Sequence, residues 1–201
     1  MAIITPPAPL PLRKVRWRLP PKAQTNRSGW TGRSKVLGLP GAEFWTVRGE
    51  FVTQIGADAA LPWKAFFFRL RGPMNSFRLR AVEKQQTTVT NARVAGGDGG
   101  TNITLYGLPP SQIVLRAGHM MTVPLPSGHE RLVGLTADIV ADAAGQAAVS
   151  FAPELGEVPV VGTLVEIVWP HALLRFTGED PGWDVEPGQT YIFPFQAEEA
   201  L

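Results

Sequence analysis

The stretch that decides the fold reads Trp63-Lys-Ala-Phe-Phe-Phe-Arg-Leu-Arg-Gly-Pro-Met-Asn-Ser-Phe-Arg-Leu79. In its first half, large apolar side chains recur at i, i+3, i+4 and i+7, the spacing that places them on one face of an α-helix. These side chains are Trp63, Phe66, Phe67 and Leu70. Asp58 can cap the start of the helix, Gly72 can supply a left-handed residue at its end, and Pro73 forbids continuation. The pattern therefore predicts a short helix near residues 59–71.

After this helix the period of the apolar residues changes from 3.6 to 2. Residues 76–81 alternate between apolar and polar side chains, which predicts a strand with one buried face and one basic face. The buried face would carry Phe77, Leu79 and Ala81, and the other face Ser76, Arg78 and Arg80. No other segment has a convincing helical period. With 21 Gly and 19 Pro among 201 residues, the chain is predicted to be all-β with one short helix.

The first part of the chain is expected to add an arm, strands and a loop to this unit. Residues 1–14 are proline-rich and apolar, which indicates an extended arm that docks on a partner or on its own barrel. A short strand follows at 15–19, and the polar, glycine-rich residues 22–41 predict a loop in which Trp30 anchors something else. The clearest alternation, at 44–55, predicts one strand. Its apolar face would carry Trp45, Val47, Phe51 and Ile55.

The second half consists of short alternating segments separated by Gly, Pro and Asp, a pattern typical of a β-barrel or sandwich. A Thr-rich strand is expected at 85–94, and the glycine cluster 96–100 favours a hairpin loop or a joint between two lobes. The cluster lacks the Lys-Ser/Thr and the following helix of a phosphate-binding loop. We therefore expect a basic β-sandwich or split-barrel lobe at 15–95 and an acidic, barrel-like lobe at 96–201.

Charge is distributed unevenly along the chain, although the net charge is only +2. Residues 1–100 contain 16 Lys and Arg against 5 Asp and Glu, whereas residues 101–201 contain 3 against 12. Such asymmetry indicates a basic surface for a polyanion, or complementary faces of neighbouring subunits. The third alternative is that the two halves neutralise each other within one monomer.

The residues that catalysis or metal binding would need are missing or isolated. The chain has no cysteine, which excludes disulfides, thiolate metal sites and thiol nucleophiles. Its three histidines, His119, His129 and His171, have no second ligand at a metal-binding spacing, and no nucleophile elbow occurs. Carboxylates such as Glu154 and Asp184 are expected to be solvated in turns and not to form the catalytic pair of a glycosidase. We therefore expect no enzymatic activity, no metal and no cofactor.

Membrane insertion and secretion are not expected either. The most hydrophobic stretch, Val158–Trp169, is shorter than the 18 apolar residues of a membrane span and carries Glu166. The N-terminus has no basic region before its apolar residues and is broken by prolines, which is unlike a secretory signal.

The helix–turn–strand unit resembles a signature of distal tail or baseplate-hub (minor tail) proteins from long-tailed bacteriophages and gene-transfer agents. The residues that carry the resemblance are Trp63, Phe67, Leu70, Arg71, Gly72, Asn75, Phe77 and Leu79. A similar order continues through Leu115–Gly118, the strand end at 141–145, Ala152-Pro153 and Leu174–Phe176. His119 departs from the small acidic residue expected after Gly118.

The resemblance implies a structural protein of the virion that is synthesised in the cytoplasm of the bacterial host. Such proteins form a homo-oligomeric ring, commonly a hexamer, at the distal end of the tail tube, where they contact tail-tube and hub or tip proteins. Nucleic acid and membranes are not expected as partners. The second functional hypothesis is a polyanion-binding β-module. The third is a carbohydrate-binding β-module that uses Trp30 or Trp183.

Candidate contact residues lie away from the apolar faces. Phe68 is far from the buried face of the helix and lies between Lys64 and Arg71, which indicates an aromatic anchor for a subunit contact. Cationic and aromatic residues also alternate around Trp17 and Phe77, as they do in nucleic-acid-binding proteins. Both aromatic side chains are expected in the core, however, where they could not stack on bases. The expected interface, which would meet acidic residues of a neighbouring subunit or tail partner, comprises Phe68, Arg69, Arg71, Arg78, Arg80 and Trp30.

Overall fold

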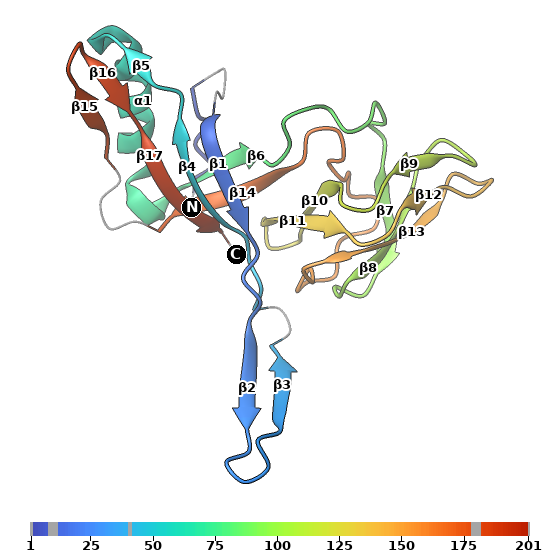
Figure 1. The fold of residues 1–201 in the computed structure, drawn as a ribbon. Coiled ribbons are helices and arrows are strands. Elements are labelled where there is room, and N and C mark those ends of the chain that lie inside the picture. The colour runs from blue at the N-terminus through green and yellow to red at the C-terminus, as the bar shows by residue number, and fades with distance from the viewer. Residues whose placement is uncertain (1, 8–11, 40–41, 178–181, 201) are drawn as a thin grey trace.

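The computed structural model describes residues 2–7, 12–39, 42–177 and 182–200. It consists of β-strands and one α-helix, α1 (Ala57–Leu70), followed by a short 3₁₀ helix, η1 (Gly72–Met74). Two hydrophobic cores lie side by side, and a two-stranded hairpin projects away from them (Figure 1). The predicted all-β fold with one short helix is confirmed.

Five antiparallel strands curl into an open half-barrel, and α1 covers one of its faces (Figure 1). In spatial order they are β1 (Leu12–Arg18), β4 (Thr46–Phe51), β17 (Pro194–Glu199), β14 (His171–Phe176) and β6 (Ser76–Arg80). The first core lies between this sheet and the helix. Because β1 and β6 are the two ends of the strand order, the half-barrel has two edges.

The predicted apolar face of α1 is buried against this sheet. Its four large side chains are each at most 4% exposed; they are Trp63, Phe66, Phe67 and Leu70. The predicted cap was wrong. Gly56, with a φ of 89°, takes the N-cap position without a side-chain hydrogen bond, and a positive φ of this kind favours glycine. Asp58 lies inside the first turn instead, where its negative charge is favourable to the helix dipole.

The end of α1 uses two left-handed residues rather than the single one expected. Arg71 has a φ of 51° and Gly72 a φ of 64°. Asn75 then closes the turn, because its side-chain Nδ2 donates to the carbonyl of Arg69 (2.9 Å) and its backbone N–H to that of Leu70 (3.2 Å). These bonds satisfy carbonyl groups that a helix end leaves without partners. The turn thereby aims the chain directly into β6.

The N-terminal arm docks on its own sheet, which is one of the two alternatives left open by its sequence. The backbone N–H of Ala2 donates to Oδ1 of Asn75 (3.0 Å), and that of Ile4 donates to the carbonyl of Ser76 (2.7 Å). Ile4 is only 7% exposed and joins the first core. The arm therefore pairs with the start of β6; its residues 1 and 8–11 lie outside the described ranges.

The second core is built by a five-stranded sheet and a two-stranded one. The larger sheet has the order β10 (Met120–Pro124), β11 (Glu130–Leu135), β13 (Ala147–Ala152), β8 (Asn102–Tyr106) and β7 (Arg93–Gly97). The smaller one pairs β9 (Ile113–Leu115) with β12 (Ile139–Val140). Nearly all the buried residues here are aliphatic, with Phe151 as the exception.

The two cores do not divide the chain at residue 96 as expected. The glycine cluster 96–100 lies at the turn of the β7–β8 hairpin, in agreement with its reading as a hairpin loop. β14 and β17, which were expected in the second lobe, pair with β6 and β4 and complete the first sheet. Alternation along a strand indicates which side chains are buried, but it carries no information about which strand lies beside it.

Three further expectations differ from the structure. The Thr-rich residues 85–92 are not a strand, and β7 begins only at Arg93. The strand expected at 44–55 breaks after β4, and the separate β5 (Gln54–Ile55) leaves Ile55 77% exposed. The loop expected at 22–41 contains the projecting hairpin of β2 (Ala23–Arg27) and β3 (Ser34–Gly38).

A small three-stranded sheet lies beside the helix at the outer end of the first core (Figure 1). It consists of β5, β16 (Thr190–Ile192) and β15 (Asp184–Glu186), in that order. β15 is therefore an edge strand, and all three of its residues are exposed.

Candidate functional site

The predicted interface residues lie at three separate places, the first of which is the outer side of α1. Phe68 is 67% exposed, and the edge of its ring lies against Trp183, with 5.8 Å between the ring centroids. The ammonium group of Lys64 lies 5.0 Å from the centroid of the same tryptophan. Arg69 and Arg71 are exposed near the end of the helix. These residues form a small aromatic and cationic patch.

The second place is the junction between the two cores, where Arg78 and Arg80 project from β6. Nε of Arg78 donates to Oε2 of Glu130 on β11 (2.6 Å). The guanidinium group of Arg80 lies 4.0 Å from the ring centroid of Trp169, within the range of a cation–π contact. The two arginines are thus engaged by groups of their own chain and do not share one surface with Phe68.

Glu130 is the electrostatic centre of this junction. Its Oε2 also lies 3.0 Å from Nε2 of His171 on β14. Partial burial by itself raises the pKa of Glu130, but hydrogen bonds and positive charge from His171 and Arg78 outweigh burial and lower the pKa to about 2. The carboxylate therefore stays ionised far into the acidic range and ties β6 and β14 to the second sheet.

A second polar contact at the junction is fully buried. Nη1 of Arg131 donates to Oε2 of Glu199 (2.7 Å), and both side chains are at most 1% exposed. Glu199 also accepts the backbone N–H groups of Trp45 (3.2 Å) and Leu132 (3.0 Å), while Nε of Arg131 donates to the carbonyl of Glu154 (3.0 Å). Buried charges are tolerated when they are paired in this way. The pair was not predicted because Arg131 and Glu199 are 68 residues apart, and nothing in the residues around either of them distinguishes it from a solvated charge.

The third place is the tip of the β2–β3 hairpin, where Trp30 is 100% exposed. The tip is held by its own hydrogen bonds: the backbone N–H of Ser28 donates to the carbonyl of Arg33 (2.9 Å), and that of Thr31 donates to Oγ of Ser28 (3.2 Å). Both strands are exposed throughout. Residues 22–39 carry four Lys and Arg and no Asp or Glu, so the hairpin is a cationic ribbon with an aromatic tip.

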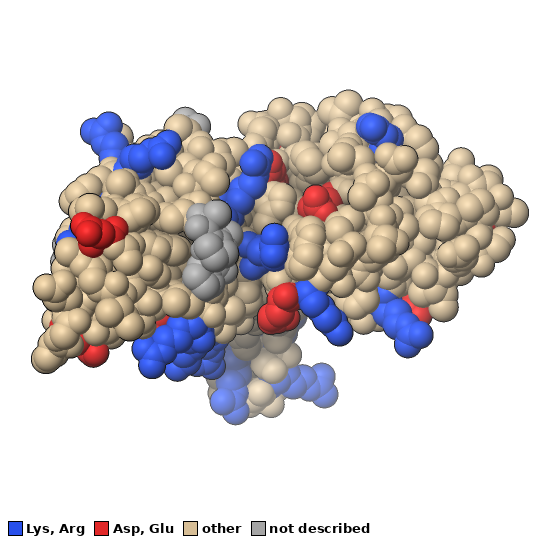
Figure 2. All heavy atoms as spheres, turned by 90° about the horizontal axis from the view of Figure 1, so that it is seen from above, with Lys and Arg blue, Asp and Glu red and all other residues tan. Residues whose placement is uncertain are grey.

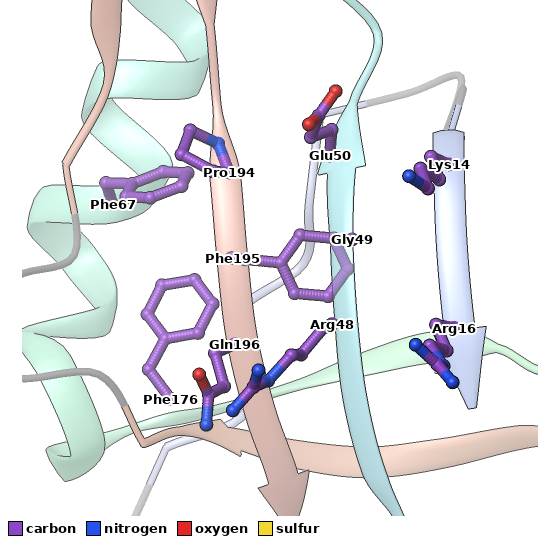
Figure 3. A pocket seen from close by; sticks show the side chains of 10 residues that line it. All are labelled: Lys14, Arg16, Arg48, Gly49, Glu50, Phe67, Phe176, Pro194, Phe195 and Gln196. Atoms are coloured by element: carbon purple, nitrogen blue, oxygen red, sulfur yellow. The ribbon is translucent and has the colours of Figure 1, made fainter. Parts of the chain in front are cut away.

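A basic face that was not predicted lies on the outer side of β1 and β4. Lys14, Arg16 and Arg48 are exposed there, and no ion pair among the described residues involves them. They border a pocket of about 460 Å³ that β17 completes (Figure 3). The alternation of Lys14 and Arg16 with apolar residues was visible in the sequence, but the neighbourhood of Arg48 depends on strand pairing.

Gly49 of β4 lines this pocket and has no room for a side chain. Gly49 lies opposite Phe195 of β17, and a Cβ atom at position 49 would be 2.9 Å from the phenylalanine ring and 2.6 Å from the carbonyl oxygen of Lys14. Phe67 and Phe176 add further aromatic lining (Figure 3). Aromatic walls with a cationic rim are suited to an apolar group that carries negative charge.

Several carboxylates around the second core are bound by backbone groups of their own chain. Four of them accept backbone N–H groups in turns: Asp138 from Ala117 (2.7 Å), Asp142 from Gln146 (2.8 Å), Glu157 from Ser127 (3.1 Å) and Glu166 from Val168 (2.8 Å). Figure 2 shows Lys and Arg side chains mainly over the first core and the hairpin, with sparse charge over the second core at the right. The excess positive charge of the first half is therefore displayed at the surface.

Two of the three histidines lie against backbone groups. Nδ1 of His119 accepts the backbone N–H of Arg116 (3.3 Å), and Nδ1 of His129 lies 2.9 Å from the carbonyl oxygen of Ala200. In the described part of the chain, no group of three or more His, Cys, Asp and Glu is arranged to hold a metal ion. None of the helices in these ranges is long and apolar enough to cross a membrane. No protein-family model matches the chain, and a search of curated proteins finds no match.

Proposed function

We propose that the protein is a structural component of a bacteriophage-type tail, in which it forms a homo-oligomeric ring at the distal end of the tail tube. In this role it is a distal tail or baseplate-hub protein of the virion, with tail-tube and hub or tip proteins as its neighbours. The resemblance of the helix–turn–strand unit supports the proposal. The structural observation that carries it is the projecting hairpin of β2 and β3.

The hairpin supports assembly because none of its strand residues is buried within the protomer. An isolated two-stranded hairpin is at best marginally stable in water, and no residue of β2 or β3 is buried. The hairpin and its base nevertheless expose four large apolar side chains: Trp30 (100%), Val36 (63%), Leu37 (42%) and Leu39 (51%). Apolar side chains exposed on a projecting hairpin indicate a surface that another chain covers.

The junction between the cores supports a structural role rather than a catalytic one. The charged groups that the fold buries or pairs most closely are Glu130, Arg131 and Glu199, and each joins strands of one sheet to strands of the other. Such contacts fix the orientation of two rigid parts, which a ring subunit needs in order to close with a constant angle.

Shortening the hairpin tests the proposal. An Asn-Gly turn that replaces residues 23–38 can join Lys22 to Leu39, because the backbone N–H of Leu39 already donates to the carbonyl of Lys22 (2.9 Å). The intact protein should form particles of several subunits in light scattering and electron microscopy, and the shortened one should remain a folded monomer. Thr25→Ala, which leaves the apolar side chains in place, is the matched control. A monomeric intact protein would contradict the proposal, and an unchanged ring without the hairpin would show that the hairpin is not part of the subunit contact.

The four cations of the hairpin favour a second candidate, the binding of a polyanion. A two-stranded ribbon fits the major groove of duplex DNA, and cationic contacts with phosphates give an affinity that falls steeply with salt. Tight, salt-sensitive binding of DNA or heparin that is lost in Arg27→Gln with Arg33→Gln would favour this candidate over the ring. Of the two tryptophans considered for carbohydrate binding, Trp183 packs against Phe68, so Trp30 alone is fully exposed.

A further inference from the structure

We propose that the free edge of β1 in one protomer pairs with the free edge of β15 in the next, so that an intermolecular β-sheet joins the subunits of the ring. The inference rests on the proposed ring and adds to the hairpin contact a second contact, between two strand edges of neighbouring subunits. Residues Lys14–Arg16 are named the cationic edge, and residues Asp184–Glu186 the acidic edge.

Both strands lack a partner on one side. Among the described residues β1 pairs with β4 alone, and β15 pairs with β16 alone. The free side of β1 borders a hollow of about 480 Å³, whose opposite wall is formed by residues 79–83 at the end of β6. This hollow separates the two edges of the half-barrel and leaves room for a short strand. An unpaired edge presents a row of N–H and C=O groups to which another strand can bind.

The two edges match in sequence. Each is a charged residue, a valine and a second charged residue, with opposite signs on the two strands. Residues two apart on a strand lie on the same face, about 7 Å from each other, so the two cations have the same spacing as the two carboxylates. All four charged side chains are exposed. When Val15 lies opposite Val185, both cations face carboxylates, whether the strands run parallel or antiparallel.

The valines add an apolar contact on the other face of this sheet. Val185 is 59% exposed, and Val15 is a partly buried residue that packs at the border of the first core. Pairing the two strands would cover both side chains. The patch of Phe68 and Trp183 is continuous with the acidic edge, since Trp183 directly precedes β15 in the chain.

The two edges lie on different sides of the first core. In Figure 1, β15 lies at the outer left of the first core, whereas β1 lies on the side that faces the second core. A contact between two different surfaces is heterologous and generates a ring when the rotation closes. Pairing of either edge with its own copy would place like charges opposite each other, which is unfavourable. The cationic hairpin of a neighbour is disfavoured at the cationic edge for the same reason.

Because the chain contains no cysteine, the pairing can be tested by disulfide trapping. The variants Val15→Cys and Val185→Cys are prepared separately, mixed under oxidising conditions and separated on a non-reducing gel. Opposed residues in paired strands have Cα atoms about 4.5–5.5 Å apart, within disulfide range. The mixture should give a covalent dimer, and the double variant a ladder whose highest rung counts the subunits of the ring. Val114→Cys on β9, a strand valine that is partly buried like Val15 but belongs to the second core, is the matched control and should give no dimer with Val185→Cys.

Charge reversal is an independent test. Lys14→Glu with Arg16→Glu should raise the protein concentration at half-assembly by about ten-fold or more, because two attractive contacts become repulsive. Asp184→Lys with Glu186→Lys should do the same. Combining the four changes in one chain should restore assembly, since the signs are then exchanged rather than opposed. Far-ultraviolet circular dichroism checks that each variant is folded.

The outcomes separate this inference from the proposed function. A wild-type ring that forms no Val15–Val185 disulfide and is not rescued by the exchanged charges overturns the edge pairing and leaves the ring in place. A disulfide between two Val185→Cys chains would mean self-pairing and overturns it as well. A wild-type protein that stays monomeric at every concentration overturns the ring, and the pairing with it.

Discussion

The first and second cores are filled by different kinds of side chain. Among the described residues, ten of the 19 that form the first core are aromatic, whereas the second core has one aromatic residue among its 19. In the first core the rings interlock: Phe51 lies 4.5 Å from Phe195 and 4.6 Å from Trp63, measured between centroids. A helix over a curled sheet leaves a deep space that large rings fill, while the second core is packed with aliphatic side chains.

The surfaces around the two cores also differ, in their charged groups. The part around the first core displays unpaired cations, two free strand edges and the hairpin, whereas several carboxylates of the second are bound in turns. Both parts nevertheless expose large apolar side chains, among them Trp30 and Phe68 in the first part and Val140 and Val161 in the second. This contrast teaches that acidic residues of the second half of the chain serve two ends: those in turns around the second core bind the backbone, whereas Asp184 and Glu186 are exposed on β15 beside the first core.

The largest effect is expected from emptying the aromatic core. Phe67→Ala should lower the free energy of unfolding by about 3–5 kcal/mol, because the ring is 4% exposed and lies 5.3 Å from Phe176 and 5.6 Å from Phe193. Urea unfolding followed by tryptophan fluorescence measures this, since no tryptophan belongs to the buried set of the second core. Near-wild-type stability would mean that the buried helix face is misassigned.

Leu105→Ala in the second core sharpens the same comparison. If the junction couples the two cores, this variant should shift the tryptophan transition and the circular-dichroism transition together. Two separated transitions would show that the aromatic and aliphatic parts unfold as independent units.

Removing one partner of the buried ion pair should have the next largest effect. Glu199→Ala leaves Arg131 charged, buried and without its carboxylate, which is expected to cost about 3 kcal/mol or more. Arg131→Met combined with Glu199→Leu should recover much of this loss, because no buried charge then remains. Thermal unfolding of the single and double variants decides the point, and equal losses in both would argue against an electrostatic origin.

A methyl group at position 49 should have a smaller effect. Gly49→Ala would press its Cβ against the ring of Phe195 and the carbonyl of Lys14, at a cost of about 1–3 kcal/mol. Gly134→Ala is the control, because the nearest atom to its Cβ is the carbonyl oxygen of Ala152 at 3.8 Å. Denaturant unfolding of both variants compares a crowded strand glycine in the first sheet with a roomy one in the second.

The parts of the fold that were predictable are those governed by neighbouring residues. The helix, its end near Gly72 and the strand at Phe77 follow from apolar spacing and from two residues that break helices. The β2–β3 hairpin was missed for a physical reason. Alternation arises when one face of a strand is buried, and neither face of this hairpin is, so its sequence has no period to detect.

The contacts at the junction were not predictable because they depend on residues far apart in the chain. Arg78 was expected at a subunit interface because it lies on the polar face of a strand. A solvated arginine and an arginine paired within its own chain both occupy such positions, so the sequence pattern does not distinguish them. Its partner Glu130 is 52 residues away on β11, in the other five-stranded sheet. The exposed place of Phe68 was predictable, since helical periodicity alone puts it opposite the buried face.

Acid should weaken the junction between the cores by a modest amount. The folded-state pKa of Glu130 is about 2, below its ordinary value of 4.5, so its contribution to stability is present above pH 4.5 and is lost as the pH falls towards 2. Because the carboxylate is partly solvated, we expect about 1–2 kcal/mol. Glu130→Gln should remove this part of the acid dependence in melting curves recorded between pH 5 and pH 2; an unchanged slope would assign the dependence to other carboxylates.

The smallest effect on the monomer is expected at Phe68, the helix neighbour of Phe67. Because its side chain is 67% exposed and touches the ring edge of Trp183, Phe68→Ala should change the free energy of unfolding by about 0.5 kcal/mol or less. The same change should weaken assembly by about 2 kcal/mol if the phenyl group of Phe68, which lies near the acidic edge of its own protomer, is buried against the neighbouring subunit. Arg78→Ala should do the reverse, because its ion pair with Glu130 belongs to the junction. Light scattering over a dilution series, paired with urea unfolding, separates the two responses. A Phe68→Ala protein that assembles normally but unfolds early would place this ring with the core and the subunit contact elsewhere.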